Sequence, residues 1–150
     1  MKEFIIDKNV DVVSSNEEYP AYFFDDLKKS ARVRIVLGGT NYKREVREKA
    51  ALRELVSQLI SANRVRSVSD ATVDGHEQAL RTRIIDICGS CPQECDDHHI
   101  FALAHVSGCR NILTKDRRMA SCRDQIRNRV GHDFCPDIRL VMSEAAYRDT

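Results

Sequence analysis

Short apolar runs that stop at turn residues predict the strands of this chain. The run FII ends at Asp7, and the run VRIVL ends at the pair Gly38-Gly39. Continuous apolar runs of this length are typical of strands buried on both faces of a parallel sheet. The run RVRSVS alternates charged residues with apolar or small ones and indicates a strand with one more exposed face. In chain order, we expect strands at residues 4–6, 33–37, 64–69, 111–114 and 139–142.

Apolar residues at helical spacing predict helices between these strands. A longer helix follows the second strand, and its expected buried stripe is Leu52, Leu55, Val56, Leu59 and Ile60. These residues recur with the period of one helix face. Further helices are expected over 17–32, from a cap at Asp74 to Gly89, from Asp97 to Gly108, and in a short stretch opened by Asp116. Strands that alternate with helices indicate an α/β fold with a mostly parallel sheet and helices on both faces.

Length and charge narrow the class of protein. A chain of 150 residues with 42% hydrophobic content suits one core, so we expect a single domain over 1–150. The 24 Lys and Arg residues nearly balance the 23 Asp and Glu residues, so a local patch rather than the overall field must hold an anionic partner. The first apolar run is too short for a signal peptide, and no stretch approaches the ~20 apolar residues of a membrane span. We therefore expect a soluble, cytoplasmic protein.

The six cysteines all lie in the second half of the chain. Because no export signal is present, free thiols are the default expectation. Cys88, Cys91 and Cys95, followed by His98 and His99, have ligand types that bind zinc. A structural zinc site usually pairs two such knuckles, and the second is missing here. Ordinary buried or loop thiols are therefore favoured over a zinc site.

Four acidic residues are expected at one edge of the sheet. Asp7 directly follows the first strand, and Asp116 comes two residues after Thr114, at the end of the fourth. Glu45 lies early in the helix after the second strand, and Asp97 begins the helix that leads to the fourth. Each residue alone is explained as well by a helix cap, a turn or a solvated helix face. Together they favour a site at the carboxyl ends of the strands, where hard Mg²⁺ or Mn²⁺ would offset their repulsion.

Four segments of the chain resemble the motifs of the PIN domain nucleases in order and approximate spacing. They are FIIDKN, GGTNYKRE, DDHHIFALA and ILTKDRRM, and together they span nearly the whole chain. By this resemblance, the metal-binding acidic positions are Asp7, Glu45, Asp97 and Asp116, with Asn9 and Thr114 as supporting polar residues. Asp96 competes with Asp97, which is preferred because Ala102 and Ala104 then stand at the offsets of the family's helix.

The resemblance implies a fold and an activity. It implies a three-layer α/β/α sandwich with a parallel sheet of about five strands, and a Mg²⁺- or Mn²⁺-dependent endoribonuclease. Carboxylate-held ions can both activate water and stabilise the charge that develops on the phosphate. In this hypothesis Asp7, Asp97 and Asp116 hold the metal directly, while Glu45 binds a second ion or orients the water.

Basic residues near the four carboxylates are the candidates for binding RNA phosphates. They are Lys43, Arg44, Arg47, Lys115, Arg117 and Arg118. For each of them, a solvated helix face is the commoner explanation. His98 and His99 adjoin Asp97, although a surface or core histidine is favoured over one at the scissile phosphate.

Two other classes of function fit part of the pattern. A receiver-like signalling domain also gathers carboxylates around Mg²⁺, but Asp70 after the third strand supplies only a poor phosphoacceptor. A catalytically silent interaction module would keep the fold without needing all four acidic residues. Within the nuclease hypothesis, the resemblance implies a toxin restrained by an antitoxin protein, an RNA-processing enzyme or a defence nuclease. The partners are then RNA, the antitoxin and a second copy of the chain.

Overall fold

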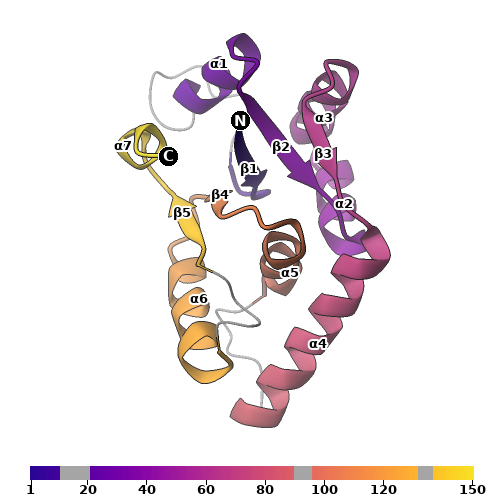
Figure 1. Ribbon diagram of the computed structural model, residues 1–150, viewed down its shortest axis with the longest axis vertical. Helices are drawn as coiled ribbons and strands as arrows, with labels where there is room; N and C mark the ends of the chain where they lie inside the picture. The colour runs from indigo at the N-terminus through magenta and orange to yellow at the C-terminus, as the bar shows by residue number, and fades with distance from the viewer. Residues whose placement is uncertain (11–20, 90–95, 132–136) are drawn as a thin grey trace.

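A five-stranded parallel sheet forms the middle of the structure (Figure 1). This computed structural model describes residues 1–10, 21–89, 96–131 and 137–150. The strands are β1 (Lys2–Ile6), β2 (Val33–Leu37), β3 (Val65–Ser67), β4 (Asn111–Leu113) and β5 (Arg139–Val141). They are hydrogen-bonded in the order β3-β2-β1-β4-β5, and every neighbouring pair is parallel. The predicted strands and the parallel sheet are therefore confirmed.

Helices cover both faces of the sheet. They are α1 (Ala21–Lys29), α2 (Thr40–Glu48), α3 (Ala50–Ser61), α4 (Asp70–Cys88), α5 (His98–Ser107), α6 (Arg118–Arg129) and α7 (Glu144–Arg148). Helices α1 and α7 contact each other on one side of the sheet, and α4 contacts both α5 and α6 on the other (Figure 1). This arrangement is the expected three-layer α/β/α sandwich. No helix in the described part of the chain is long and apolar enough to cross a membrane.

The longer helix predicted after the second strand is two helices. Lys49 separates α2 from α3 with an extended backbone, φ −101° and ψ 103°. Its ammonium donates to the carbonyl oxygens of Lys8 and Val10, so this residue ties the helical pair to the loop after β1. The predicted stripe on α3 is buried except at Ile60, which is 56% exposed. The prediction was wrong there, because in this last turn it is Leu59 that is buried while Ile60 is exposed.

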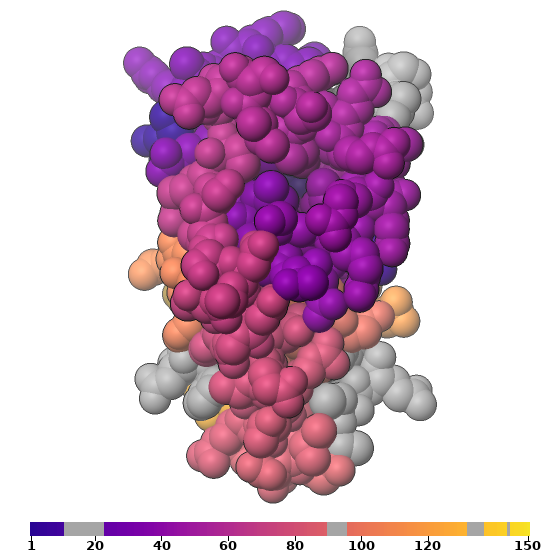
Figure 2. Space-filling model, turned by 90° about the vertical axis from the view of Figure 1, so that its right-hand side faces the viewer, coloured from indigo at the N-terminus to yellow at the C-terminus, as the bar shows by residue number. Residues whose placement is uncertain are grey.

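The start of α4 also differs from the prediction. The cap is Ser69, whose hydroxyl accepts a hydrogen bond from the backbone of Thr72 at 3.3 Å. Asp74 lies inside α4 and instead accepts from the backbone N–H of Thr40 at 2.8 Å, while Asp70 accepts from Gly39 at 3.0 Å. Acidic side chains of α4 therefore satisfy the free N–H groups of α2. Figure 2 shows the face on which α2 and α4 pack together.

The remaining helices agree with the pattern to different degrees. Helix α5 begins after Asp97 and ends at Gly108 in the left-handed conformation, as predicted. Helix α6 is longer than the short helix expected after Asp116, and α7 was not predicted. Helix α1 falls within the predicted range 17–32, whose residues 17–20 lie outside the described part.

The core has tightly packed side chains on both sides of the sheet. On one side of the sheet, Phe23 of α1 lies 4.9 Å from Phe4 of β1 and 5.3 Å from Tyr147 of α7, measured between ring centroids. On the other side, α5 is buried along the whole segment Ile100–Ala104. A helix enclosed in this way has little freedom to shift, so the residue at its start is held in place.

A charge ladder crosses three neighbouring strands. The carboxylate of Glu3 on β1 accepts from Arg34 of β2 at 2.7 Å and from Arg66 of β3 at 2.6 Å. Arg66 also donates to the carbonyl oxygen of Ser107, at the end of α5, at 2.7 Å. Burial raises the pKa of Glu3, but the two arginines outweigh it and the pKa is lowered. The ladder thus stays ionised and links β1, β2 and β3.

The cysteines correct one expectation. Cys88 and Cys109 are free thiols, as expected, although Cys88 is only half-buried rather than part of the buried face. Cys122 is buried and disulfide-bonded, so the expectation of free thiols was wrong for this residue. Which sulfurs the fold brings together decides the pairing, and the expectation rested on cell compartment alone. The zinc alternative involves Cys91 and Cys95, which lie outside the described residues.

Candidate metal centre

Two carboxylates stand at the ends of adjacent strands. In the parallel register of β1 and β4, Ile6 lies opposite Leu113. The backbone N–H of Asp7 donates to the carbonyl oxygen of Leu113 at 2.9 Å, so both chains leave the sheet at the same level. Asp7 and Asp116 therefore lie at one edge, as parallel strands require.

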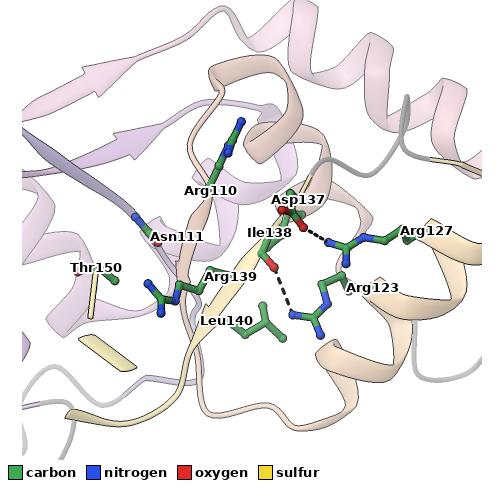
Figure 3. Close-up of a pocket in the computed structure, with 9 residues that line it drawn as sticks. All are labelled: Arg110, Asn111, Arg123, Arg127, Asp137, Ile138, Arg139, Leu140 and Thr150. Carbon is green, nitrogen blue, oxygen red and sulfur yellow. Dashed lines mark hydrogen bonds and ion pairs between the residues drawn. The ribbon is translucent and has the colours of Figure 1, made fainter. Parts of the chain in front are cut away.

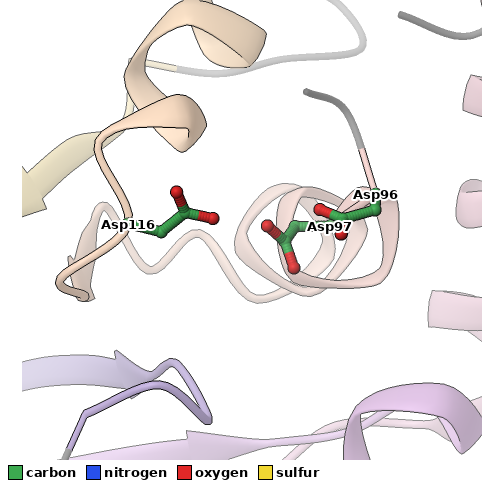
Figure 4. Close-up of side chains that lie close together, drawn as sticks. All are labelled: Asp96, Asp97 and Asp116. Atoms are coloured by element: carbon green, nitrogen blue, oxygen red, sulfur yellow. The ribbon is translucent and has the colours of Figure 1, made fainter. Parts of the chain in front are cut away.

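Asp97 approaches this edge from the start of α5. It is the N-cap residue, yet its side chain makes no capping hydrogen bond and is 7% exposed. Carboxylate oxygens of Asp96, Asp97 and Asp116 all lie within 4.8 Å of one another. Figure 4 shows the side chain of Asp116 pointing toward Asp97 and Asp96. Both Asp97 and its sequence competitor Asp96 belong to the group.

A pocket of about 410 Å³ surrounds these groups and mixes acidic with basic side chains. The residues that line it are Asp7, Lys8, Asn9, Asp96, Asp97, Lys115, Asp116, Arg117 and Arg118. We call it the carboxylate pocket. It joins Asp7 to the three clustered aspartates, and it places basic side chains around them.

Thr114 and Asn9 support the aspartates. The Thr114 hydroxyl donates to Asp7 at 2.7 Å and accepts from the backbone N–H of Asp116 at 3.0 Å. The side-chain oxygen of Asn9 accepts from the backbone N–H of Lys115 at 3.2 Å. Both predicted supporting residues therefore connect the end of β1 to the end of β4.

Two of the aspartates, Asp97 and Asp7, resist ionisation. Burial raises the pKa of Asp97 to about 7, and the negative charges of Asp7 and Asp96 add to the effect. Burial also raises the pKa of Asp7, assisted by the charges of Glu45 and Asp116, although the Thr114 hydroxyl acts in the opposite direction. A cation bound among such crowded and partly desolvated carboxylates would supply further compensating positive charge.

Comparisons with protein-family models, with curated proteins and with solved structures found no match. The likeness to PIN domain nucleases therefore rests on the four sequence segments. A fold alone does not determine an activity, so the chemistry of the site has to indicate the function.

Glu45 lies beside the pocket but does not line it. One of its oxygens accepts from the ammonium of Lys8 at 3.1 Å, and the other lies 2.8 Å from Nε2 of His99. Burial raises the pKa of Glu45, but these two partners outweigh it and lower the pKa. The buried hydroxyl of Tyr42, on the same helix, donates to the carbonyl oxygen of Ile6 at 2.6 Å and fixes α2 against the end of β1. The structure thus places Glu45 next to the aspartates, outside their cluster.

The adjacent histidines have different roles. His99 pairs with Glu45, which the sequence reasoning did not predict, although its position two residues after Asp97 was a signal. His98 is 1% exposed, and neither ring nitrogen has a hydrogen-bond partner in the described part of the chain. Burial lowers its pKa to about 4, so this ring is neutral at physiological pH. His98 is therefore a core residue, the reading that the sequence favoured.

The six predicted phosphate-binding residues divide into two sets. Lys115, Arg117 and Arg118 line the carboxylate pocket. The other set lies on α2, where Lys43 pairs with Asp70 at 2.8 Å and lines a separate pocket together with Arg47. Arg44 is exposed and lines neither of these two pockets. Lys8, which the sequence reasoning did not single out, completes the basic rim of the carboxylate pocket.

Proposed function

We propose that this protein is a metal-dependent ribonuclease that hydrolyses phosphodiester bonds at the carboxylate pocket. The observation that carries the proposal is the grouping of Asp96, Asp97 and Asp116 within 4.8 Å at the carboxyl edge of a parallel sheet. Ligands of α/β folds bind at this edge. The pKa of about 7 at Asp97 adds support, because perturbed carboxyl groups gather at functional sites.

The donor set suits a hard divalent cation. All three clustered groups offer carboxylate oxygens, the ligands preferred by Mg²⁺ and Mn²⁺. Oxygens bound to one octahedral Mg²⁺ stand roughly 3–4 Å apart, since each bond is about 2.1 Å long. The observed spacing, within 4.8 Å, is close to this range. A bound cation would also remove the repulsion that raises the pKa of Asp97.

The residues of the pocket then take separate roles. Asp97, Asp116 and either Asp96 or Asp7 hold the cation, which when bound supplies positive charge to the transition state and makes the attacking water more acidic. Lys115, Arg117 and Arg118 hold the phosphate. Both oxygens of Glu45 are engaged by Lys8 and His99, so we assign Glu45 to orienting the water rather than to direct metal binding.

The test compares metal-dependent cleavage by the wild type and by matched variants. Purified protein is incubated with total RNA and Mn²⁺ or Mg²⁺, with EDTA as the metal-free control. We expect Asp97→Asn to lower the cleavage rate at least about 100-fold, since even outer partners of metal ligands are typically worth about 10–100-fold. The matched variant Asp86→Asn changes an exposed aspartate of α4 and should cleave like the wild type.

Two outcomes would overturn the nuclease proposal. The first is the absence of metal-dependent cleavage by the wild type, or equal cleavage by the Asp97→Asn variant. The second is stable labelling of one aspartate by acetyl phosphate, which would favour a receiver-like domain. Asp70 is a poor acceptor for that reaction, because its carboxylate is already bound by the Gly39 N–H at 3.0 Å and by Lys43 at 2.8 Å.

A further inference from the structure

A larger pocket lies at the opposite edge of the sheet, where β4 and β5 begin. Its volume is about 640 Å³, and its charged lining is Arg110, Arg123, Arg127, Arg139 and Asp137 (Figure 3). We call it the arginine groove. Among the described lining residues, four arginines thus accompany one carboxylate, a local positive patch in a chain whose net charge is only +1. Such a patch attracts anions even when the whole protein is nearly neutral.

Two arginines of α6 line this groove, and Arg127 is held only weakly by its partner. Arg127 pairs with Asp137 at 2.9 Å, but Asp137 is 80% exposed, so water and salt weaken the pair. Nε of Arg127 is buried and has no hydrogen-bond partner in the described part of the chain. Arg123 donates to the carbonyl oxygen of Ile138 at 3.2 Å and pairs with Asp124 at 3.0 Å. A guanidinium carries five N–H donors, so Arg127 can donate to further anionic oxygens.

The other two arginines come from the strand side. Arg139 donates to the carbonyl oxygen of Asp149 at 2.9 Å. Within the described residues, the exposed side chain of Arg110 has neither a hydrogen bond nor an ion pair. Arg110 is therefore available to a ligand without the loss of an internal contact.

The arrangement of the arginines suits an extended anion. In Figure 3, Arg123 and Arg127 lie on one side of the segment 137–138, and Arg139 lies on the other. A single phosphate cannot contact groups on both sides, whereas a chain of phosphates can. None of the described residues that line the groove carries an aromatic ring on which a base could stack, so these residues would contact a backbone rather than bases. Among the described lining residues, the apolar ones are Ile138 and Leu140, which is little for the centre of a protein interface.

We propose that the arginine groove binds the phosphodiester backbone of single-stranded RNA outside the carboxylate pocket. The choice of RNA rests on the proposed function. Strand β4 joins the two sites, because Asn111 lines the groove and Thr114 supports the aspartates. Three residue steps along a β-strand cover about 10 Å, so one bound RNA molecule can reach both sites. The groove would then hold the RNA flanking the cleaved bond.

The test measures binding without cleavage. Anisotropy of a short fluorescein-labelled oligouridine is followed in EDTA, with wild-type protein, Arg110→Glu and the matched variant Arg83→Glu. Arg83 is exposed on α4 and lines neither the arginine groove nor the carboxylate pocket. We expect Arg110→Glu to weaken binding about tenfold and to lower the salt dependence by about one phosphate contact, while Arg83→Glu stays within about twofold. Thermal melting confirms that each variant is folded, and Arg110→Gln, which removes the charge without reversing it, should lie between wild type and Arg110→Glu.

Several results would overturn the groove proposal. They are the failure of oligouridine to bind, equal affinities for Arg110→Glu and Arg83→Glu, and competition by polyglutamate as strong as by unlabelled oligouridine. The last result would indicate an acidic polypeptide as the ligand. Because no metal is present, these outcomes are independent of the cleavage test at Asp97.

Discussion

At the scale of single residues, Asp97 combines burial with crowding. It begins a helix without capping it, and the charges of Asp7 and Asp96 oppose its ionisation. A carboxyl group held in this way costs the metal-free fold stability whenever it is charged. The same feature that prepares the site for a cation therefore makes the empty site unfavourable.

This cost predicts a pH-dependent effect of Asp97→Asn. The pKa of Asp97 is raised from 3.8 to about 7 on folding, so the folded state binds a proton that the unfolded state has lost within this window. Wild-type stability therefore falls as the pH rises from about 4 to about 8, and the neutral variant escapes this loss. In EDTA we expect Asp97→Asn to be more stable than the wild type by roughly 2 kcal/mol above pH ~7, with little difference near pH ~4.

Urea denaturation across this pH range measures the difference, with Asp86→Asn as the control. A difference in the free energy of unfolding between wild type and Asp97→Asn that does not change with pH would contradict the prediction. Addition of Mn²⁺ should then stabilise the wild type more than Asp97→Asn, because a ligand stabilises the state that binds it.

The sequence predicted where most of these residues lie in the fold, but it did not predict which groups they contact. Asp7 and Asp116 could be predicted at one edge because each follows a buried strand. Including Asp96 in the cluster needed the backbone conformation before α5, which no periodic pattern encodes. The His99 partner of Glu45 depends on how α2 packs beside α5, and that distance is set by the tertiary structure.

At the scale of elements, the turn after β2 determines where α2 stands. An added Cβ at Gly38 would lie 2.5 Å from a methyl carbon of Val68 and 2.9 Å from its carbonyl oxygen. The neighbouring Gly39 has φ +87°, a conformation that favours glycine. The Gly-Gly break that the sequence revealed is thus required both by close packing and by backbone geometry.

This close packing predicts opposite effects of two Gly→Ala substitutions. Gly38→Ala should destabilise the protein by roughly 1–3 kcal/mol, because the new methyl group collides with the backbone after β3. Gly75→Ala on the exposed face of α4, where a Cβ meets nothing within 4 Å, should stabilise it by about 0.5–1 kcal/mol. Chemical denaturation of both variants checks the signs. If Gly38→Ala left the stability unchanged, the segment around Val68 would have moved easily to make room for the methyl group.

Helix boundaries were less predictable than helix existence. The buried stripe of α3 could be predicted because buried residues recur with the helical period along the sequence. The break at Lys49 could not, because it involves hydrogen bonds to residues about 40 positions away. Asp74 matched a cap by residue type, yet it caps a different helix. Local signals identify a group that can satisfy free N–H groups, whereas tertiary packing decides which groups it reaches.

At the scale of the whole molecule, β1 is the centre of the fold. It pairs with β2 and β4, and its last three residues, Phe4–Ile6, are fully or almost fully buried. The apolar runs showed that these strands are buried, but they carry no information about neighbours. The strand order therefore could not be derived from the pattern, although the pattern predicted five strands and a parallel sheet with helices on both faces.

The central position of β1 predicts the order of hydrogen exchange. Backbone amides of β1 should exchange the most slowly, and those of the edge strands β3 and β5 faster, because a central strand opens only with the sheet. Exchange followed by mass spectrometry of peptides measures this order. Faster exchange in β1 than in β5 would contradict the assignment of the folding core.

The ladder of Glu3, Arg34 and Arg66 has an evolutionary consequence. A change at Glu3 alone would leave two half-buried cations without their shared anion, which is more damaging than losing all three charges together. Mutations at these positions should therefore be tolerated as a set and selected against singly. Among descendants of this sequence, the three residues should drift as one unit, although they lie on three strands and span more than 60 positions of the chain.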